Sequence, residues 1–215
     1  MIEENIKKIQ EEIKKYKVTL ICVSKTRSIE EIKKAYQTGI RDFGENTVKE
    51  LIEKRKLLPK DIKWHMIGHL QTNKVKSLLE EDVFLIHSID SIKLAKEISK
   101  RSKHSQDILL EINIAEEESK YGFSPNLKEL KEVLKEIQIL PNIHCLGLMC
   151  VAPNTENPKE NKKYFKKLKT LANNLNLQTL SMGMTNDYIY ACEENSTYIR
   201  IGTAIFGKRN YDMIK

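Results

Sequence analysis

Lys25 is the residue of this chain whose surroundings point most clearly to chemistry. It follows an apolar run, residues 18–24 (VTLICVS), of the kind that forms a fully buried strand. Burying the stem of a lysine there is costly, because desolvation disfavours the charged ammonium. A lysine that is readily neutral is what Schiff-base formation with a carbonyl compound requires. The run therefore predicts a lysine that binds an aldehyde, although a buried strand that merely ends at one of many lysines gives the same pattern.

Two stretches near the C-terminal end have the composition of an anion site. Residues 181–187 (SMGMTND) and 200–207 (RIGTAIFG) each contain a glycine that permits close approach of the backbone. Each also has a hydroxyl residue, Thr185 or Thr203, just before a predicted helix, where free N–H groups and the helix dipole favour an anion. Either stretch alone is better explained as an ordinary loop with a capping residue. The two together, with Lys25, favour a phosphate site.

The elements that must position these residues follow from the apolar periodicity. A leading amphipathic helix carries Ile2, Ile6, Ile9, Ile13 and Tyr16 at helical spacing. Eight strand–helix alternations follow it, with strands expected at 18–24, 40–43, 63–67, 83–88, 108–114, 143–151, 179–182 and 198–201. Such alternation with near-continuous apolar strands indicates a parallel sheet. We predict an α/β fold, a single (β/α)8 TIM-type barrel with an extra N-terminal helix that forms one domain over residues 1–215, in preference to an open doubly wound sheet.

A closed barrel brings the carboxyl ends of its strands to one face, where ligands bind. The residues that this rule groups are Lys25, Asn46, His65, Glu111, Asn113, Met149, Ser181 and Arg200. The same rule places a phosphate at the loops after the seventh and eighth strands, which are the two glycine-containing stretches. A phosphate group opposite an aldehyde-binding lysine predicts pyridoxal 5'-phosphate as the cofactor.

Composition limits the other classes of function. The chain has 215 residues, 40% of them apolar, and a formal charge of +7. Its lysines alternate with glutamates as on solvated helix faces, so we expect no nucleic-acid partner. No apolar run approaches the roughly 20 residues of a membrane span, and no signal-peptide core is present, so we expect no membrane partner and a cytoplasmic location. The four scattered cysteines predict reduced thiols and no metal site.

Six motifs, spread in order over nearly the whole chain, carry a resemblance to a known family. They are 23–26 (VSKT), 43–46 (FGEN), 64–74 (WHMIGHLQTNK), 147–149 (GLM), 180–184 (LSMGM) and 200–207 (RIGTAIFG). In this combination the sequence resembles the pyridoxal phosphate homeostasis protein family, which is similar to the barrel domain of alanine racemase.

The resemblance implies a cofactor-binding role for each matching residue and no catalytic residue. Lys25 would be the Schiff-base lysine, Asn46 would lie beside the cofactor ring, and Arg200 would face the pyridine nitrogen. The residues that would surround the phosphate are Ser181, Met184, Thr185, Gly202 and Thr203. A guanidinium stays protonated and leaves the pyridine nitrogen unprotonated, so the ring would be a poor electron sink.

Some positions depart from the family pattern or stay without an assigned role. Thr185 stands where many members carry serine, and it keeps the hydroxyl donor. Arg27 stands where a second lysine is common, which puts a secondary lysine role there in doubt. Lys120 matches a recurring lysine, but a solvated loop lysine is the better interpretation. We expect His65 and His69 to be hydrogen-bonded structural imidazoles.

The function that the resemblance implies is intracellular pyridoxal phosphate homeostasis. The chain would bind the cofactor on Lys25 and act as a carrier or buffer for pyridoxal-phosphate-dependent apo-enzymes, without robust catalysis. A racemase-like enzyme of the alanine racemase fold is the alternative, and an aldolase-type lyase is a third class. A racemase needs a second base, which alanine-racemase-like proteins take from an additional β domain. Because the sequence ends at Lys215, we expect no such domain, and we expect a monomer.

Overall fold

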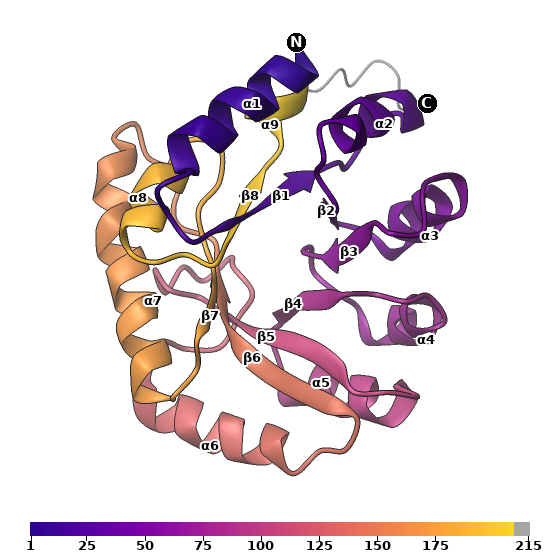
Figure 1. Ribbon diagram of the computed structural model, residues 1–215. Coiled ribbons are helices and arrows are strands. Elements are labelled where there is room, and N and C mark those ends of the chain that lie inside the picture. The colour runs from indigo at the N-terminus through magenta and orange to yellow at the C-terminus, as the bar shows by residue number, and fades with distance from the viewer. Residues whose placement is uncertain (209–215) are drawn as a thin grey trace.

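Eight strands pair side by side in chain order and close into a barrel (Figure 1). The computed structural model describes residues 1–208. The strands are β1 Thr19–Val23, β2 Asp42–Glu45, β3 Lys63–Met66, β4 Leu85–Ile89, β5 Gln106–Ile112, β6 Ile143–Cys150, β7 Thr179–Ser181 and β8 Tyr198–Ile201. All neighbouring pairs are parallel, and β1 pairs with β8 in the register Leu20↔Ile199. This closure confirms the predicted (β/α)8 barrel and rules out the open sheet.

The helices lie outside the ring of strands (Figure 1). They are α1 Ile2–Ile13, α2 Ile29–Gln37, α3 Val48–Leu57, α4 Val75–Leu79, α5 Ile92–Arg101, α6 Leu127–Gln138, α7 Lys162–Asn174, α8 Tyr188–Glu193 and α9 Thr203–Phe206, with 3-10 turns η1 Thr72–Lys74 and η2 Pro158–Asn161. The extra N-terminal helix α1 buries Ile6, Ile9 and Ile13 and contacts α2, α8 and α9, as its periodicity predicts. It therefore covers the seam between the first and last strands.

Local signals set most helix ends. Ser28 caps α2 in a capping box with Glu31, and Gly39 ends the same helix region at φ 93°, a conformation that favours glycine. Ser91 caps α5 by accepting the Leu94 N–H. The N-cap of α6 is Asn126, whose side chain accepts hydrogen bonds from two backbone N–H groups.

The second strand is shifted by two residues from its predicted range. It runs from Asp42 to Glu45 rather than over residues 40–43. Gly44 takes part in the ladder opposite His65, although a glycine inside a strand usually weakens it. A Cβ at Gly44 would lie 2.9 Å from Ile67 Cδ1 and 3.0 Å from Ile21 Cγ2, so close packing inside the barrel requires glycine there.

The core has two parts. The larger part lies between the strands and the helices and contains Trp64, Phe43 and most buried aliphatic side chains. The smaller part, inside the barrel, consists of Leu85, Leu109 and Met149 with partly buried neighbours. The rest of the barrel interior contains buried polar side chains that lie below the candidate site.

Two predictions about chain organisation have different outcomes. The single domain over 1–215 stays a prediction, because residues 209–215 lie outside the described part of the chain. Within residues 1–208, no helix is both long enough and apolar enough to cross a membrane.

Candidate functional site

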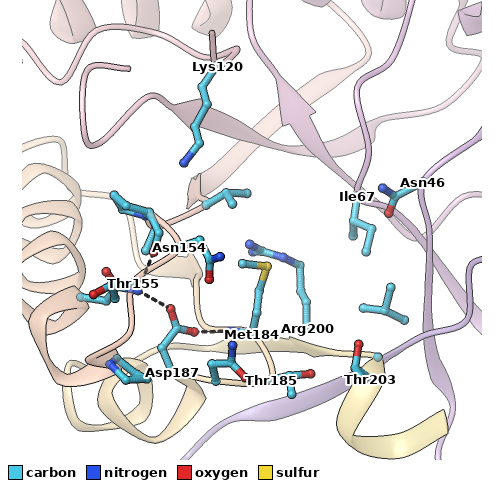
Figure 2. A pocket seen from close by; sticks show the side chains of 18 of the residues that line it. Asn46, Ile67, Lys120, Asn154, Thr155, Met184, Thr185, Asp187, Arg200 and Thr203 are labelled. Carbon is cyan, nitrogen blue, oxygen red and sulfur yellow. Dashed lines mark hydrogen bonds between the residues drawn. The ribbon is translucent and has the colours of Figure 1, made fainter. Parts of the chain in front are cut away.

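A cavity of about 550 Å³ opens at the carboxyl ends of the strands (Figure 2). Its walls come from loops that follow β1, β2, β3, β5, β6, β7 and β8. The lining residues are Val23, Lys25, Asn46, Ile67, Lys120, Val151, Ala152, Pro153, Asn154, Thr155, Pro158, Asn161, Met184, Thr185, Asn186, Asp187, Arg200, Gly202 and Thr203. Every residue predicted to bind the cofactor is among them except Ser181.

The loop that carries Lys25 is held on both sides of the lysine. Before it, the Ser24 hydroxyl donates a hydrogen bond to Glu45 Oε1 at 2.6 Å. After it, Thr26 adopts φ 63°, which is rare for a β-branched residue, and its N–H donates to Glu50 Oε1 at 2.8 Å. This strained turn is maintained by its surroundings and directs Lys25 toward the cavity wall.

A buried ion pair supports this loop from outside the barrel. Lys54 Nζ lies 2.9 Å from Glu45 Oε1 and donates to the Ser24 carbonyl at 2.7 Å. Burial raises the pKa of Glu45 to about 7, and the nearby Lys54 ammonium opposes that shift. Sequence reasoning missed the pair, although Val48, Leu51 and Lys54 lie on one helical face.

Asp187 joins two walls of the cavity. Its Oδ1 accepts the Met184 N–H at 2.7 Å, and its Oδ2 accepts Asn161 Nδ2–H at 2.8 Å (Figure 2). Asn161 also donates to the Pro153 carbonyl at 3.0 Å. The loop after β7 is thereby fixed to the segment before α7. Sequence reasoning assigned no role to Asp187 or Asn161, because their contacts join residues 26 positions apart.

The Asp187 contacts support a stability prediction. In Asp187→Ala, the Met184 N–H and the Asn161 amide lose their shared acceptor, and each hydrogen bond to a charged group contributes about 1.5–3 kcal/mol. We expect unfolding to become easier by about 2–4 kcal/mol, measured by denaturant unfolding followed by circular dichroism. The exposed neighbour Asn186 provides the control, and Asn186→Ala should change stability by less than about 0.5 kcal/mol. Equal effects of the two substitutions would contradict this role of Asp187.

The two glycine-containing loops lie next to each other, as the barrel rule predicts. Gly183 has φ 93°, and a Cβ there would lie 2.6 Å from Ala191 Cβ. A Cβ at Gly202 would lie 3.2 Å from the Val23 carbonyl oxygen, so glycine keeps this part of the wall open beside β1. The Ala204 N–H approaches Thr185 Oγ1 at 3.4 Å, which links the two loops.

Arg200 lines the cavity from the end of β8 and is only 5% exposed. Its Nη2 donates to the Cys150 carbonyl at 2.8 Å, and its Nη1 donates to Ser181 Oγ. Burial lowers the pKa of the guanidinium from its ordinary value. Ser181 thus contacts Arg200 inside the barrel and is not part of the wall, so its predicted contact with a phosphate stays untested.

The remaining strand-end residues separate into two groups. His65 and Met149 are fully buried inside the barrel. Glu111 and Asn113 line a smaller cavity of about 190 Å³ that shares Lys120 and Val151 with the first. Burial raises the pKa of Glu111, opposed by the charge of Arg200.

His65 is hydrogen-bonded, as predicted, and His69 lies in ion-pair distance of a carboxylate. His65 bonds to Asp42 and His87, whereas His69 Nδ1 lies 3.0 Å from Asp90 Oδ2 and its ring stacks on Tyr121 at 3.8 Å. Lys120 Nζ contacts Glu117 Oε1 at 2.6 Å and lines both cavities. Within residues 1–208, no group of three His, Cys, Asp or Glu side chains is arranged to hold a metal ion.

The chemistry of this wall suits one kind of ligand. A primary amine (Lys25), two hydroxyl groups (Thr185 and Thr203) and a guanidinium (Arg200) surround a single cavity. An amine condenses with an aldehyde, and hydroxyl groups beside glycine turns suit an anionic group. The arrangement fits a small planar aldehyde that carries a phosphate.

The fold and the site define a barrel protein of the alanine racemase type. Residues 1–210 match the family described as "Alanine racemase, N-terminal domain". The alanine racemase of Clostridium difficile has the same fold, with a TM-score of 0.80 at 15% identity over 98% of this chain and 57% of the racemase.

Within that class, the chain belongs to the pyridoxal phosphate homeostasis protein family. It is 46% identical to the family member of Aquifex aeolicus over 203 residues, which cover 89% of this chain and 87% of the relative. It is 37% identical to the member of Pasteurella multocida over 98% of both chains. PipY of Synechococcus elongatus, solved without pyridoxal phosphate, superposes with a TM-score of 0.88 at 33% identity over 96% of this chain and 100% of PipY. PipY solved with pyridoxal phosphate bound superposes with a TM-score of 0.85.

Proposed function

We propose that this chain binds pyridoxal 5'-phosphate as a Schiff base on Lys25 and acts in intracellular pyridoxal phosphate homeostasis, as a carrier or buffer for apo-enzymes. The observation that carries the proposal is that Lys25 lines the same cavity as Thr185, Gly202 and Thr203. Family membership supports it, and so does the PipY structure that contains the cofactor.

The residues present fit the cofactor. Gly202 lines the cavity and lets the loop after β8 lie close to β1, since a Cβ there would lie 3.2 Å from the Val23 carbonyl oxygen. Thr185 and Thr203 would supply hydroxyl groups to the phosphate from two linked loops. The Met184 N–H already donates to Asp187, so it would not be available to the phosphate. Met184 would instead help to shape the pocket. Asn46 lines the cavity on the side of β2, where the cofactor ring would lie.

Arg200 favours binding over turnover. Pyridoxal phosphate supplies an electrophilic aldehyde and a ring that withdraws electrons best when its nitrogen is protonated. A guanidinium opposite that nitrogen only donates and keeps its own proton, so the nitrogen would stay unprotonated. Carbanion formation on a bound amino acid would be disfavoured. We therefore propose a holding role without robust catalysis.

The proposal is tested with purified wild-type protein and added pyridoxal phosphate. We expect a new absorption band that borohydride removes, because reduction adds hydride to the C=N bond and leaves a secondary amine on the lysine. Peptide mapping of the reduced protein should place the cofactor on Lys25. The loaded protein should then restore the activity of a pyridoxal-phosphate-dependent apo-enzyme.

Two outcomes would contradict the proposal. One is the absence of any borohydride-sensitive band at saturating cofactor. The other is racemisation of alanine or another amino acid at on the order of 10 per second, a typical enzyme rate, which would support the racemase-like alternative.

A further inference from the structure

A continuous chain of hydrogen bonds crosses the barrel interior from Arg200 to Asp42. Arg200 Nη1 donates to Ser181 Oγ, and Ser181 Oγ lies 2.8 Å from His87 Nδ1. His87 Nε2 lies 2.9 Å from His65 Nδ1, and His65 Nε2 lies 2.9 Å from Asp42 Oδ1. We call these five side chains the barrel relay. They come from five different strands, β8, β7, β4, β3 and β2.

The relay is removed from solvent. Ser181, His87 and His65 have no exposed surface, and the Asp42 side chain is 15% exposed. Below the two imidazoles, the ring of Tyr198 packs edge-on at 5.5 Å from His65 and 5.8 Å from His87. A buried polar group without a partner is costly, so every proton of the relay must have an acceptor.

The chemistry of the two ends fixes the direction of every bond. Arg200 can only donate, so Ser181 Oγ accepts there and gives its own proton to His87 Nδ1. A neutral imidazole has one donor and one acceptor, so His87 donates from Nε2 to His65 Nδ1. His65 then donates from Nε2 to Asp42, whose carboxylate can only accept. One arrangement of protons therefore satisfies all four contacts with both imidazoles neutral.

The reverse arrangement is costly. It needs His87 to carry its proton on Nδ1 and His65 to be protonated on both nitrogens beside Asp42. It also leaves the Ser181 proton without an acceptor in the chain. Burial lowers the pKa of both imidazoles. At His65 the neighbouring Asp42 opposes this shift and Lys63 adds to it, whereas at His87 both His65 and Arg200 add to it. These surroundings favour the neutral forms.

We propose that His87, His65 and Asp42 are positioning residues for Arg200, acting through Ser181 as one directed hydrogen-bond relay. Ser181 on one guanidinium nitrogen and the Cys150 carbonyl on the other fix the plane of the group where it lines the cavity. The aligned bonds connect a buried cation on β8 to a carboxylate on β2, through side chains of β7, β4 and β3. The part of this inference that concerns the cofactor rests on the proposed function, and the part that concerns the relay does not.

The relay itself is tested by nitrogen NMR on the protein without added cofactor. We expect both His65 and His87 to be neutral with the proton on Nε2 from about pH 5 to pH 8, with exposed His104 as the reference imidazole. The Arg200 guanidinium N–H signals should be individually resolved in the wild type and should average in Ser181→Ala. A proton on Nδ1 of either histidine, a protonated His65, or Arg200 signals that Ser181→Ala leaves unchanged would each overturn the inference.

The link to the site is tested by a double-mutant cycle on the dissociation constant for pyridoxal phosphate. Ser181→Ala should weaken binding about tenfold, which corresponds to about 1.4 kcal/mol. In an Arg200→Ala background the same change should have no further effect, since Ser181 acts only through Arg200. Independent, additive losses would overturn the positioning role. If no variant and no wild-type protein binds the cofactor, the proposed function fails, while the NMR result still decides the relay.

Discussion

Lys25→Ala protein, mixed with pyridoxal phosphate and reduced with borohydride, is expected to contain no covalent adduct. Alanine lacks the amine that condenses with the aldehyde, whereas the loops with Thr185, Gly202 and Thr203 stay in place. We therefore expect residual, reversible binding that is weaker by at least about a hundredfold, or about 2.7 kcal/mol. Absorption titration gives the dissociation constant, and intact mass after reduction gives the adduct.

The matched control is the other lysine of the same cavity. Lys120 lines the wall opposite, and its Nζ contacts Glu117. Lys120→Ala should keep the borohydride-stable adduct at one cofactor per chain. An adduct on Lys25→Ala protein, or its loss from Lys120→Ala protein, would assign the covalent site to a residue other than Lys25.

Lys54→Met is expected to destabilise the fold by about 3–5 kcal/mol, because it leaves Glu45 buried without its cation. Glu45 is fully buried, and its Oε2 has no hydrogen-bond partner among the described residues. The measurement is the free energy of unfolding in urea. The double variant Glu45→Gln with Lys54→Met should recover most of the loss, since a neutral amide no longer needs the ammonium.

The Glu45–Lys54 pair also predicts how the stability of the fold changes with pH. The pKa of Glu45 is about 7 in the folded chain and near its ordinary value of 4.5 in the unfolded chain. The folded state thus binds the proton more tightly, so this group's contribution to stability falls as pH rises from about 4.5 to about 7. In Lys54→Met the folded pKa rises further, and the penalty should be larger at pH 8 than at pH 5. A penalty that does not change with pH would contradict this account.

The Lys25→Ala and Lys54→Met experiments concern the same short loop after β1, which carries Lys25. Glu45 accepts a hydrogen bond from Ser24, and Lys54 donates to the Ser24 carbonyl, immediately before the lysine. Loss of the pair should therefore also weaken cofactor binding, through the position of Lys25. The lysine proposed to bind the cofactor thus has a support from β2 and α3.

The sequence by itself determined the repeated pattern and the residues at its ends. Apolar runs of strand length that alternate with amphipathic helices require a parallel sheet with helices outside, and a closed barrel then brings Lys25, Asn46 and Arg200 to one face. These inferences succeed because they depend on local periodicity and on a rule that holds for every such barrel. Helix caps such as Ser28 and Ser91 are local too, because each accepts a hydrogen bond from the backbone N–H three residues further on.

The tertiary structure alone decided which polar side chains meet. The sequence predicted Ser181 at the phosphate from its position in a motif, and that contact stays a prediction; the structure adds that Ser181 lies inside the barrel beside Arg200 and His87. The pairing of Asp187 with Asn161 and that of Glu45 with Lys54 were missed. Each contact joins different elements, so it depends on how those elements pack together. The contacts of Ser181 depend in addition on strand register and on which face of a strand each residue occupies. A shift of one residue moves a side chain between the barrel interior and the helix layer, and only the closed structure fixes that choice.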